Sequence, residues 1–585
     1  MKQLKHLLTV ALASVLALLI AVPAFAASDN LIKVEGLESG DAVKAYQVIK
    51  WDTTTAGAGK WVLTDDFKGL IGGDLGATED AVIEAIAGKV VNGAHVPAEF
   101  TMAKANTIAG ELAKTPAPTP TYTGNADGSG VWQKADPAAG LYMVVVTATH
   151  PNIVYNPIFV GADYIPYGEG QGKNKTNEID AEEATYIGTG ATAVAKKTEI
   201  SVTKTAADAE MEFKQAIDSK VGETVNFKIE TTLPVFLSSY TERVFNITDE
   251  VTDGIELNPV SIEVTVDPAC DENAYTVTPD GTDGFTVEFT DDFLASNTVP
   301  RTVTVEYSGK ITNAATFNLN YDNNTVTVDY SNGPDGETGA LKDITNHYTF
   351  SLGAQLLKTD DVKYRTYELV KVGVDEDGEW VVDTHQVSEI DGAPTVGYLG
   401  GAVFGLYTDE ACTELYKNDL YPDGATFETK AETYGVITFN GLAEGTYWLK
   451  EISAPAGYVG DTQAHEVKIV AHYSQEKTVP AHKEGEIWVA EYKYVELTGY
   501  DVIIDPETDN ETTSTYTVTY NQNDPTIIDT VLPGINNTNI ENTPGVELPS
   551  TGGIGTTIFY VVGGAMVLCG IVMFITKRRI AQIEE

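Results

Sequence analysis

One acidic residue stands where a β-strand would turn it toward apolar neighbours, in the stretch YWLKEISAPAGY at residues 447–458. Side chains of a strand alternate between its two faces, so Tyr447, Leu449 and Glu451 share one face. An ionised carboxylate is unfavourable on a buried face unless it is paired, so Glu451 is expected to be protonated, hydrogen-bonded or on an exposed edge. Burial favours a neutral lysine together with a protonated acid, and an amine is nucleophilic only in its neutral form.

Two lysines could supply that amine in the same region. In FSLGAQLLK, the apolar residues at 350, 352, 354 and 356 share a parity with Lys358, which places Lys358 at the end of an apolar face. Lys371 shows a similar pattern with Tyr367 and Leu369, and it remains the competitor.

The middle of the chain repeats this logic with an aspartate. Lys204 shares a strand face with residues 200 and 202, and Asp249 shares one with residues 245 and 247 of VFNITDEV. Two asparagines also continue apolar faces. In NTVTVDYSN, Asn332 continues the face of residues 326, 328 and 330, and Asn346 is in phase with residues 348, 350 and 352. The plain alternative is a Lys204–Asp249 ion pair with no covalent bond.

The two ends of the chain carry export signals. Residues 1–26 have two early lysines, an apolar run and small residues at AFA, which predicts a secretory signal peptide cleaved after Ala26. Near the other end, ELPSTGG at 547–553 precedes an uncharged stretch over 554–576 and the basic residues 577–579. That stretch is long enough to span a bilayer, and the basic cluster is expected to stay in the cytoplasm.

Composition limits the classes of function. The chain has 585 residues, enough for three or four domains, and its net charge of −48 argues against binding to nucleic acid. The three cysteines, Cys270, Cys412 and Cys569, lie far apart in the sequence and do not suggest a disulfide framework. Short runs such as YMVVVTA, RTVTVEYSG and STYTVTYNQ predict a mainly β fold of sandwich domains, with helical periods only near 79–88 and 103–114.

Several of these strings together resemble a known family. ELPSTGG in its position resembles the LPxTG sorting signal of Gram-positive wall proteins, and YWLKEISAPAGY is similar to the E-box of sortase-assembled SpaA/FimA-type pilins with Cna B-type domains. FNITDEVTDGIEL resembles the segment that carries the assisting Asp in Cna A-type domains, and most of residues 30–165 resembles the first domain of such pilins.

The resemblance implies a domain order and a set of site residues. It implies tandem immunoglobulin-like Cna A- and Cna B-type sandwiches, a mixed N-terminal domain and a C-terminal transmembrane sorting segment. The expected divisions are a signal peptide over 1–26, an N-terminal pilin domain over 27–197, a Cna A-type domain over 198–347, a Cna B-type domain over 348–546 and the sorting region over 547–585. Asp249 and Glu451 would assist autocatalytic amide bonds that join Lys204 to Asn332 and Lys358 to Asn542.

The resemblance also implies two sites at which sortases act on this chain, a cleavage signal and a lysine that attacks the cleaved signal of another subunit. The sortase would recognise Leu548, Pro549, Ser550, Thr551 and Gly552 and cleave between the last two. The usual YPKN pilin motif is absent, so the lysine that polymerises the subunits is carried over by position to Lys197 or Lys196 in ATAVAKKTEISV.

The sequence thus predicts the structural backbone subunit of a covalent, cell-wall-anchored pilus that supports adhesion. A monomeric wall-anchored adhesin or a minor pilin is the alternative. The expected partners are pilus-class and housekeeping sortases, identical subunits joined head to tail, peptidoglycan, and host or microbial surface ligands. No HExxH or GxSxG string occurs, so we expect no enzyme, no cofactor and no metal site.

Overall fold

The structure is a computed structural model, and it describes a defined set of residues. They are 31–52, 60–87, 89–91, 94–96, 101–114, 116–150, 152–162, 192–207, 212–240, 242–333, 338–353, 355–357, 365–375, 377–378, 389–390, 393–394, 397–485, 487–520, 528–545, 566–569 and 571–573. The predicted signal peptide, the LPxTG string and Lys358 lie outside this set, as does most of the predicted membrane segment over 554–576. Among the described residues, no helix combines the length and apolar character needed to cross a membrane.

The chain divides into two compact units. The first contains residues 1–349, 472–498 and 520–527, and the second contains 350–471, 499–519 and 528–585. The division lies two residues from the predicted boundary at 347/348, whereas residues 472–498, which the sequence placed in the last domain, group with the first unit. The division into an N-terminal and a middle domain at 197/198 stays a prediction.

In the described residues of the N-terminal part of the first unit, strands are accompanied by two α-helices. A five-stranded sheet contains β10, β8, β2, β3 and β6, and a three-stranded sheet contains β11, β1 and β7. The helices at α2 and α3 coincide with the two helical periods of the sequence, and they pack Val82, Ile83 and Ile108 into an apolar core with the larger sheet. The elements of this part are β1 (Leu31–Glu35), β2 (Ala42–Asp52), β3 (Lys60–Leu63), η1 (Asp65–Leu70), α2 (Glu79–Ala87), β4 (Lys89–Val91), β5 (Ala94–Val96), α3 (Met102–Ala109), η2 (Gly110–Ala113), β6 (Tyr122–Asn125), β7 (Val131–Ala135), β8 (Gly140–Thr147), β9 (Ile153–Tyr155), β10 (Ile158–Ala162), β11 (Thr192–Val194) and β12 (Lys197–Glu199).

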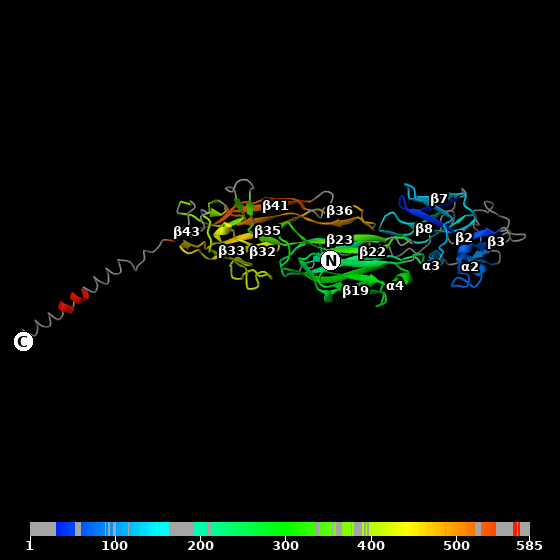
Figure 1. Cartoon of the computed structure of the whole chain (residues 1–585), viewed down its shortest axis with the longest axis horizontal. Coiled ribbons are helices and arrows are strands. Elements are labelled where there is room, and N and C mark those ends of the chain that lie inside the picture. Colours follow the sequence, from blue (N-terminus) through cyan, green and yellow to red (C-terminus); the bar gives the residue numbers. More distant parts are fainter. Residues whose placement is uncertain are drawn as a thin grey trace, which may run out of the picture. The chain divides into compact units, whose positions relative to one another are not determined.

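The rest of the first unit contains two larger sheets. One has the order β13-β15-β21-β17 with β18 also on β21, and the other has the order β19-β20-β16-β22-β23-β38-β37 with β14 also on β23. The neighbouring strands β22 and β23 lie side by side in Figure 1. The elements are β13 (Val202–Ala207), β14 (Ala216–Asp218), β15 (Thr224–Leu233), β16 (Phe245–Val251), β17 (Ile255–Leu257), η4 (Pro259–Ser261), β18 (Glu263–Asp267), β19 (Tyr275–Asp280), β20 (Gly284–Phe289), α4 (Asp291–Ser296), β21 (Arg301–Ile311), β22 (Asp322–Ser331), β23 (Thr338–Tyr348), β36 (Lys477–Val479), β37 (His482–Glu484), β38 (Ile487–Val489) and β39 (Tyr492–Tyr494).

Alternation of polar and apolar residues explains how these two sheets bury one face each. Along β16 the side chains of Phe245, Ile247 and Asp249 are buried, while the intervening Asn246 and Thr248 are partly exposed. Strand β15 alternates in the same way over ten residues. The period of two therefore places Asp249 inside the apolar core, as its parity predicted.

The second unit contains a seven-stranded sheet and a smaller sheet that brings distant segments together. The larger sheet has the order β31-β30-β33-β35-β40-β41-β42, and the smaller one has the order β27-β43-β34. The elements are β24 (Phe350–Leu352), β25 (Gln355–Leu357), β26 (Arg365–Tyr367), β27 (Leu369–Gly373), β28 (Glu389–Ile390), β29 (Ala393–Pro394), β30 (Val403–Tyr407), β31 (Thr426–Glu428), η5 (Ala431–Thr433), β32 (Phe439–Leu442), β33 (Gly445–Ser453), β34 (Tyr458–Val459), β35 (Ala464–Tyr473), β40 (Leu497–Ile504), β41 (Thr512–Tyr520), β42 (Ile528–Gly534) and β43 (Thr538–Pro544).

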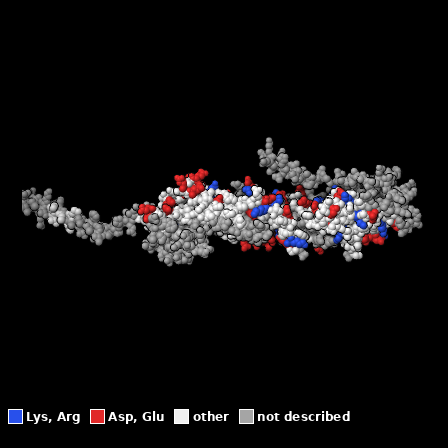
Figure 2. Space-filling view, turned by 90° about the horizontal axis from the view of Figure 1, so that it is seen from above, with Lys and Arg blue, Asp and Glu red and all other residues white. Residues whose placement is uncertain are grey.

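The prediction of a mainly β, multi-domain chain is confirmed, because strands dominate both units. The three cysteines are free. On the face shown in Figure 2, acidic side chains are spread over the described surface, in keeping with the net charge of −48.

Candidate functional site

The second unit brings a lysine, a glutamate and an asparagine together from three strands. Strand β27 pairs in parallel with β43, and this register sets Lys371 opposite Ile540 and Gly373 opposite Asn542. Strand β33 buries Tyr447, Leu449 and Glu451 on one face, as the alternation of YWLKE predicted. All three polar residues of the cluster, Lys371, Glu451 and Asn542, are buried.

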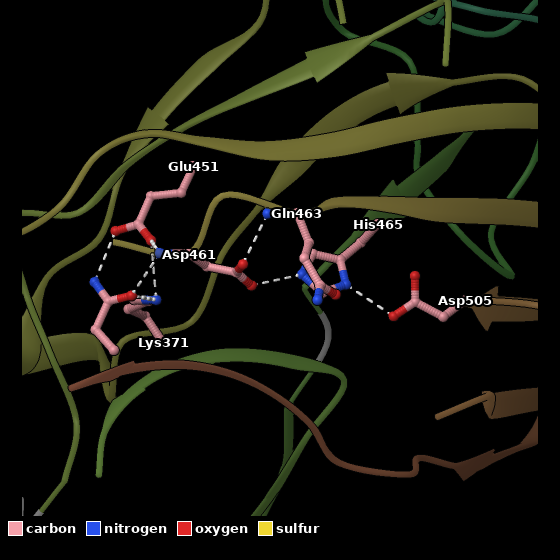
Figure 3. Close-up of polar contacts among 7 residues, drawn as sticks. Lys371, Glu451, Asp461, Gln463, His465 and Asp505 are labelled. Carbon is pink, nitrogen blue, oxygen red and sulfur yellow. Dashed lines mark hydrogen bonds and ion pairs between the residues drawn. The ribbon is translucent and has the colours of Figure 1, made fainter. Parts of the chain in front are cut away.

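The three side chains touch in a closed triangle, and Figure 3 labels two of them, Lys371 and Glu451. Lys371 Nζ donates to Asn542 Oδ1 at 2.6 Å and to Glu451 Oε2 at 3.1 Å. Asn542 Nδ2 donates to Glu451 Oε1 at 2.9 Å. One oxygen of Glu451 thus faces the amine, and the other faces the amide nitrogen. A carboxyl group in this position can accept a proton from one nitrogen and deliver a proton to the other.

Burial shapes the charge state of Lys371. Removal from water lowers its pKa, because the charged ammonium loses solvation, and attraction to Glu451 offsets only part of this effect. The ring of Phe404 lies 5.7 Å from the lysine nitrogen. A lower pKa increases the share of neutral amine, which is the nucleophilic form.

The competing lysine is therefore the one that the structure places in the cluster. The sequence chose Lys358 over Lys371, because Lys358 ends a longer run of apolar alternation. Lys358 lies outside the described residues, whereas Lys371 contacts both Glu451 and Asn542. Both lysines continue an apolar parity in the sequence, so alternation alone could not identify the one that joins the cluster. The pairing of β27 with β43 makes the distinction.

A second buried lysine lies in the first unit. Lys204 of β13 and Asp249 of β16 form an ion pair with neither side chain exposed to solvent. Lys204 Nζ also contacts the hydroxyl group of Tyr307 on β21, and that hydroxyl donates to Asp249 Oδ2 at 2.8 Å. The sequence predicted the inward positions of Lys204 and Asp249 but gave no role to Tyr307.

The asparagine beside this pair is Asn324, a fully buried residue near the start of β22. Its Nδ2 donates to the Tyr307 hydroxyl at 3.1 Å. A phenol has one proton to donate and two lone pairs to accept with. Tyr307 uses these capacities for Asp249, Lys204 and Asn324, and so connects all three residues.

The electrostatics of this site favour neutral partners. Burial lowers the pKa of Lys204 and raises the pKa of Asp249, although each attracts the other's charged form. Burial also raises the pKa of Tyr307, and the charge of Asp249 adds to this rise, so the phenol keeps its proton. Hydrogen bonds from Tyr307 and Asn324 act to lower the pKa of Asp249, and burial outweighs them.

The structure does not bring the predicted acceptor Asn332 to Lys204. Strand pairing puts Val326 opposite Asp249, and Asn332 lies six residues further along the chain, about 20 Å away at 3.3 Å per residue. The rival Asn346 points to the other face of β23 from Thr345, and Thr345 is the residue opposite Asn324. The side-chain Nδ2 of Asn346 donates to the backbone carbonyl of Val495. Asn324 shares the parity of Asn332, so alternation could have found it.

The predicted polymerising lysines both lie on the surface. Lys197 begins β12, which pairs with β9, and it forms an ion pair with Glu38. Its side chain is 36% exposed, and Lys196 is also exposed. Lys196 and Lys197 are thus open to solvent, unlike the buried Lys204 and Lys371.

Two family models match the chain. The SpaA prealbumin-like fold domain matches residues 386–483, and the LPXTG cell wall anchor motif matches residues 540–581. These matches confirm the predicted sorting signal and the resemblance to SpaA-type proteins. The chain therefore carries a cell-wall anchor behind a prealbumin-like domain.

Individual proteins are similar over most of their length. The trypsin-resistant surface T6 protein of Streptococcus pyogenes serotype M6 is 24% identical over 478 residues, which are 75% of this chain and 79% of that protein. The solved structure of the T6 backbone pilin of the same serotype covers 89% of this chain and all of its own, with 18% identity and a TM-score of 0.49. The major pilin subunit BcpA of Bacillus cereus covers 88% of this chain and 99% of its own, with 11% identity and a TM-score of 0.38.

Proposed function

We propose that this chain is the backbone subunit of a sortase-assembled, cell-wall-anchored pilus, and that internal lysine–asparagine amide bonds stabilise it. The observation that carries the proposal is the buried triangle of Lys371, Glu451 and Asn542 in a chain with a wall-anchor motif. The protein acts as a structural element and not as an enzyme, since each cross-link forms once, within its own chain.

The triangle supports a complete reaction. The nitrogen of neutral Lys371 attacks Cγ of Asn542, the new Nζ–Cγ bond forms, and the Cγ–Nδ2 bond breaks. One amine proton passes through the carboxyl group of Glu451 to Nδ2, which leaves as ammonia. Glu451 ends this sequence in the protonation state in which it began, so atoms and charge balance. The two oxygens of Glu451 already contact the donor and the acceptor of that proton.

The same reaction in the first unit uses Lys204, Asp249 and Asn324. Here the Tyr307 hydroxyl contacts both the aspartate and the asparagine. We assign the two sites to a Cna A-type domain in the first unit and a Cna B-type domain in the second. This assignment rests on the aspartate in one site and the glutamate in the other, together with the strings FNITDEV and YWLKEISAPAGY.

Covalent bonds of this kind suit an exported shaft. The Lys371–Asn542 bond would close a loop of 171 residues, for which chain-entropy arguments give a stabilisation of about 5 kcal/mol. An amide also resists reducing agents, and this durability does not require the three free cysteines to pair.

Assembly requires an exposed amine and the sorting signal. In the proposed reaction a sortase cleaves between Thr551 and Gly552, holds Thr551 as a thioester, and the amine of Lys197 or Lys196 of another subunit resolves it. The resulting contact is head to tail and does not close on itself, so it generates a fibre. A housekeeping sortase then joins the last subunit to peptidoglycan.

The experiment that tests this function is a cell-wall extract of a strain that expresses the full chain, boiled and separated by size. The proposal expects a ladder of high-mass species, which collapses to wall-linked monomer when Lys196 and Lys197 are both replaced by Ala. Replacement of Lys214, a surface lysine in an ion pair with Glu212, is the matched control and should leave the ladder intact. A wild-type extract with monomer alone would favour the lone adhesin and overturn the backbone role.

A further inference from the structure

The loop after β34 lies directly beside the reacting atoms of the second unit. Strand β34 pairs antiparallel with β43, which sets Val459 opposite Thr543, the residue after Asn542. Asp461 follows two residues later. A side chain at Gly460 would place its Cβ 3.2 Å from that of Ala454 and 3.5 Å from Glu451 Oε2, so the loop backbone packs closely against the acid.

The backbone N–H of Asp461 is shared between two of the reacting groups. It donates to Asn542 Oδ1 at 3.0 Å and to Glu451 Oε2 at 2.8 Å. Oδ1 is the atom that gains negative charge when an amine attacks Cγ. A donor about 3 Å from such an oxygen, fixed before the reaction, stabilises the charge as it develops.

The side chain of Asp461 is held by its own hydrogen bonds, away from the reaction (Figure 3). Its Oδ1 accepts from the backbone N–H of Gln463 at 2.8 Å, and its Oδ2 contacts His465 Nε2 at 2.9 Å. His465 Nδ1 contacts Asp505 Oδ2 at 2.8 Å. His465 belongs to β35 and Asp505 follows β40, so this chain of contacts ties the loop to two strands of the large sheet.

The charge of His465 offsets the effect of the Asp461 charge on Lys371. Burial by itself lowers the pKa of His465, but hydrogen bonds and attraction from Asp461 and Asp505 outweigh it and raise that pKa to about 9. A cationic His465 can donate to both carboxylates at neutral pH. The negative charge of Asp461 favours the ammonium form of Lys371, and the neighbouring imidazolium offsets that charge.

We propose that the backbone N–H of Asp461 polarises the Asn542 carbonyl for attack by Lys371, and that the Asp461–His465–Asp505 chain is the device that positions this donor. The inference rests on the proposed cross-link in the second unit and adds residues that the cross-linking triangle does not include. His465 and Asp505 touch none of the reacting atoms, and so they act only through the position and charge of Asp461.

The test follows cross-link formation in newly made protein. The mature chain, residues 27–551, is synthesised in a cell-free system with a short isotopic pulse, quenched in denaturant at intervals and digested. Mass spectrometry then measures the peptide pair that contains Lys371 and Asn542. Asp461→Pro removes the donor N–H, and the bond should form about 10²-fold more slowly or worse. Asp461→Asn keeps the N–H and should form the bond much faster than Asp461→Pro.

His465→Ala tests the positioning chain, with a slowing of about 10- to 10²-fold expected from a displaced donor. Two controls separate this effect from loss of folding. The bond of Lys204 should form at the wild-type rate in every variant, and Tyr416→Phe, which removes a buried hydrogen bond to Gly441, should lower stability without slowing the Lys371 bond.

The outcomes separate this inference from the proposed function. Wild-type rates in both Asp461→Pro and His465→Ala would overturn the inference and leave the cross-link standing. Equal slowing by Tyr416→Phe and His465→Ala would show a general stability effect and would also overturn it. A wild-type chain that forms no Lys371–Asn542 bond would overturn the proposed cross-link itself.

Discussion

The buried lysine of the first unit and that of the second unit sit among similar partners but reach their asparagines differently. In the second unit, Lys371 Nζ lies 2.6 Å from Asn542 Oδ1, and Glu451 contacts both nitrogens. In the first unit, Lys204 contacts Asp249 and Tyr307, and Asn324 is connected to them through the Tyr307 hydroxyl.

The two sites differ because the side chain of Glu451 is longer than that of Asp249. A glutamate has one methylene group more than an aspartate, and Glu451 spans from amine to amide without help. The shorter Asp249 contacts the phenol, and the phenol contacts the amide. The phenol therefore holds Asp249 and Asn324 together, in addition to the side-chain hydrogen bond between them that acts to lower the pKa of Asp249. We expect the Tyr307 hydroxyl to assist the reaction at Asn324, as the second carboxyl oxygen of Glu451 assists it at Asn542.

The largest expected effect comes from removing each acid in turn. Glu451→Ala should abolish the bond of the second unit and leave that of the first, and Asp249→Ala should do the reverse, because each acid contacts only its own lysine. Loss of the 171-residue closure would lower the free energy of unfolding by about 5 kcal/mol. Peptide mapping and thermal unfolding measure both effects. Loss of both bonds in a single variant would contradict two independent sites.

Substitution of asparagines sharpens the first site. Asn324→Ala should eliminate the Lys204 cross-link, because Asn324 is the asparagine that shares Tyr307 with Lys204. Asn332→Ala is the matched control and should keep the bond. Asn332 lies six residues beyond Val326, the residue opposite Asp249, which is about 20 Å at 3.3 Å per residue. Intact mass decides the matter, since each bond releases one ammonia. A bond that survives Asn324→Ala but not Asn332→Ala would overturn the assignment.

Tyr307→Phe tests the relay directly. Without the hydroxyl, Asp249 and Asn324 lose their shared partner, and cross-link formation at Lys204 should slow by about 10²-fold, the typical contribution of a positioned proton-transfer group. Pulse-labelled synthesis measures the rate, and the Lys371 bond in the same chain serves as the internal control. An unchanged rate at Lys204 would mean that the aspartate reaches the amide unaided.

The smallest effect concerns the pH dependence of stability in the second unit, where His465 lies. The pKa of His465 is raised from 6.5 to about 9 in the folded chain, so its stabilising contribution is complete below pH 6.5 and is lost as pH rises through about 9. The loss amounts to about 3 kcal/mol at most. Denaturant unfolding at about pH 6 and pH 10 measures it. His465→Gln should remove this dependence, and a steeper dependence in that variant would contradict the role of His465.

The sequence predicted the parts of both sites that depend on alternation within one strand. Lys204, Asp249 and Glu451 point inward because each continues an apolar parity, which a single strand is enough to specify. The class of fold and the anchor followed from similarly local patterns.

Alternation could not say how far along a strand a residue lies from its partner on another strand. Asn332 and Asn324 share a face, and only the pairing of β16 with β22 distinguishes them. Lys358 and Lys371 both end apolar patterns, and only the pairing of β27 with β43 brings Lys371 to Asn542. Tyr307 and Asp461 carried no local signal, since one is an ordinary strand tyrosine and the other acts through its backbone.

The central claim, that both buried lysines form amide bonds with the asparagines beside them, is tested most directly by the intact mass of the purified mature chain, residues 27–551, followed by peptide mapping. We predict a mass lower than the sequence mass by two molecules of ammonia, with Lys204 joined to Asn324 and Lys371 joined to Asn542. The unmodified mass would contradict the account.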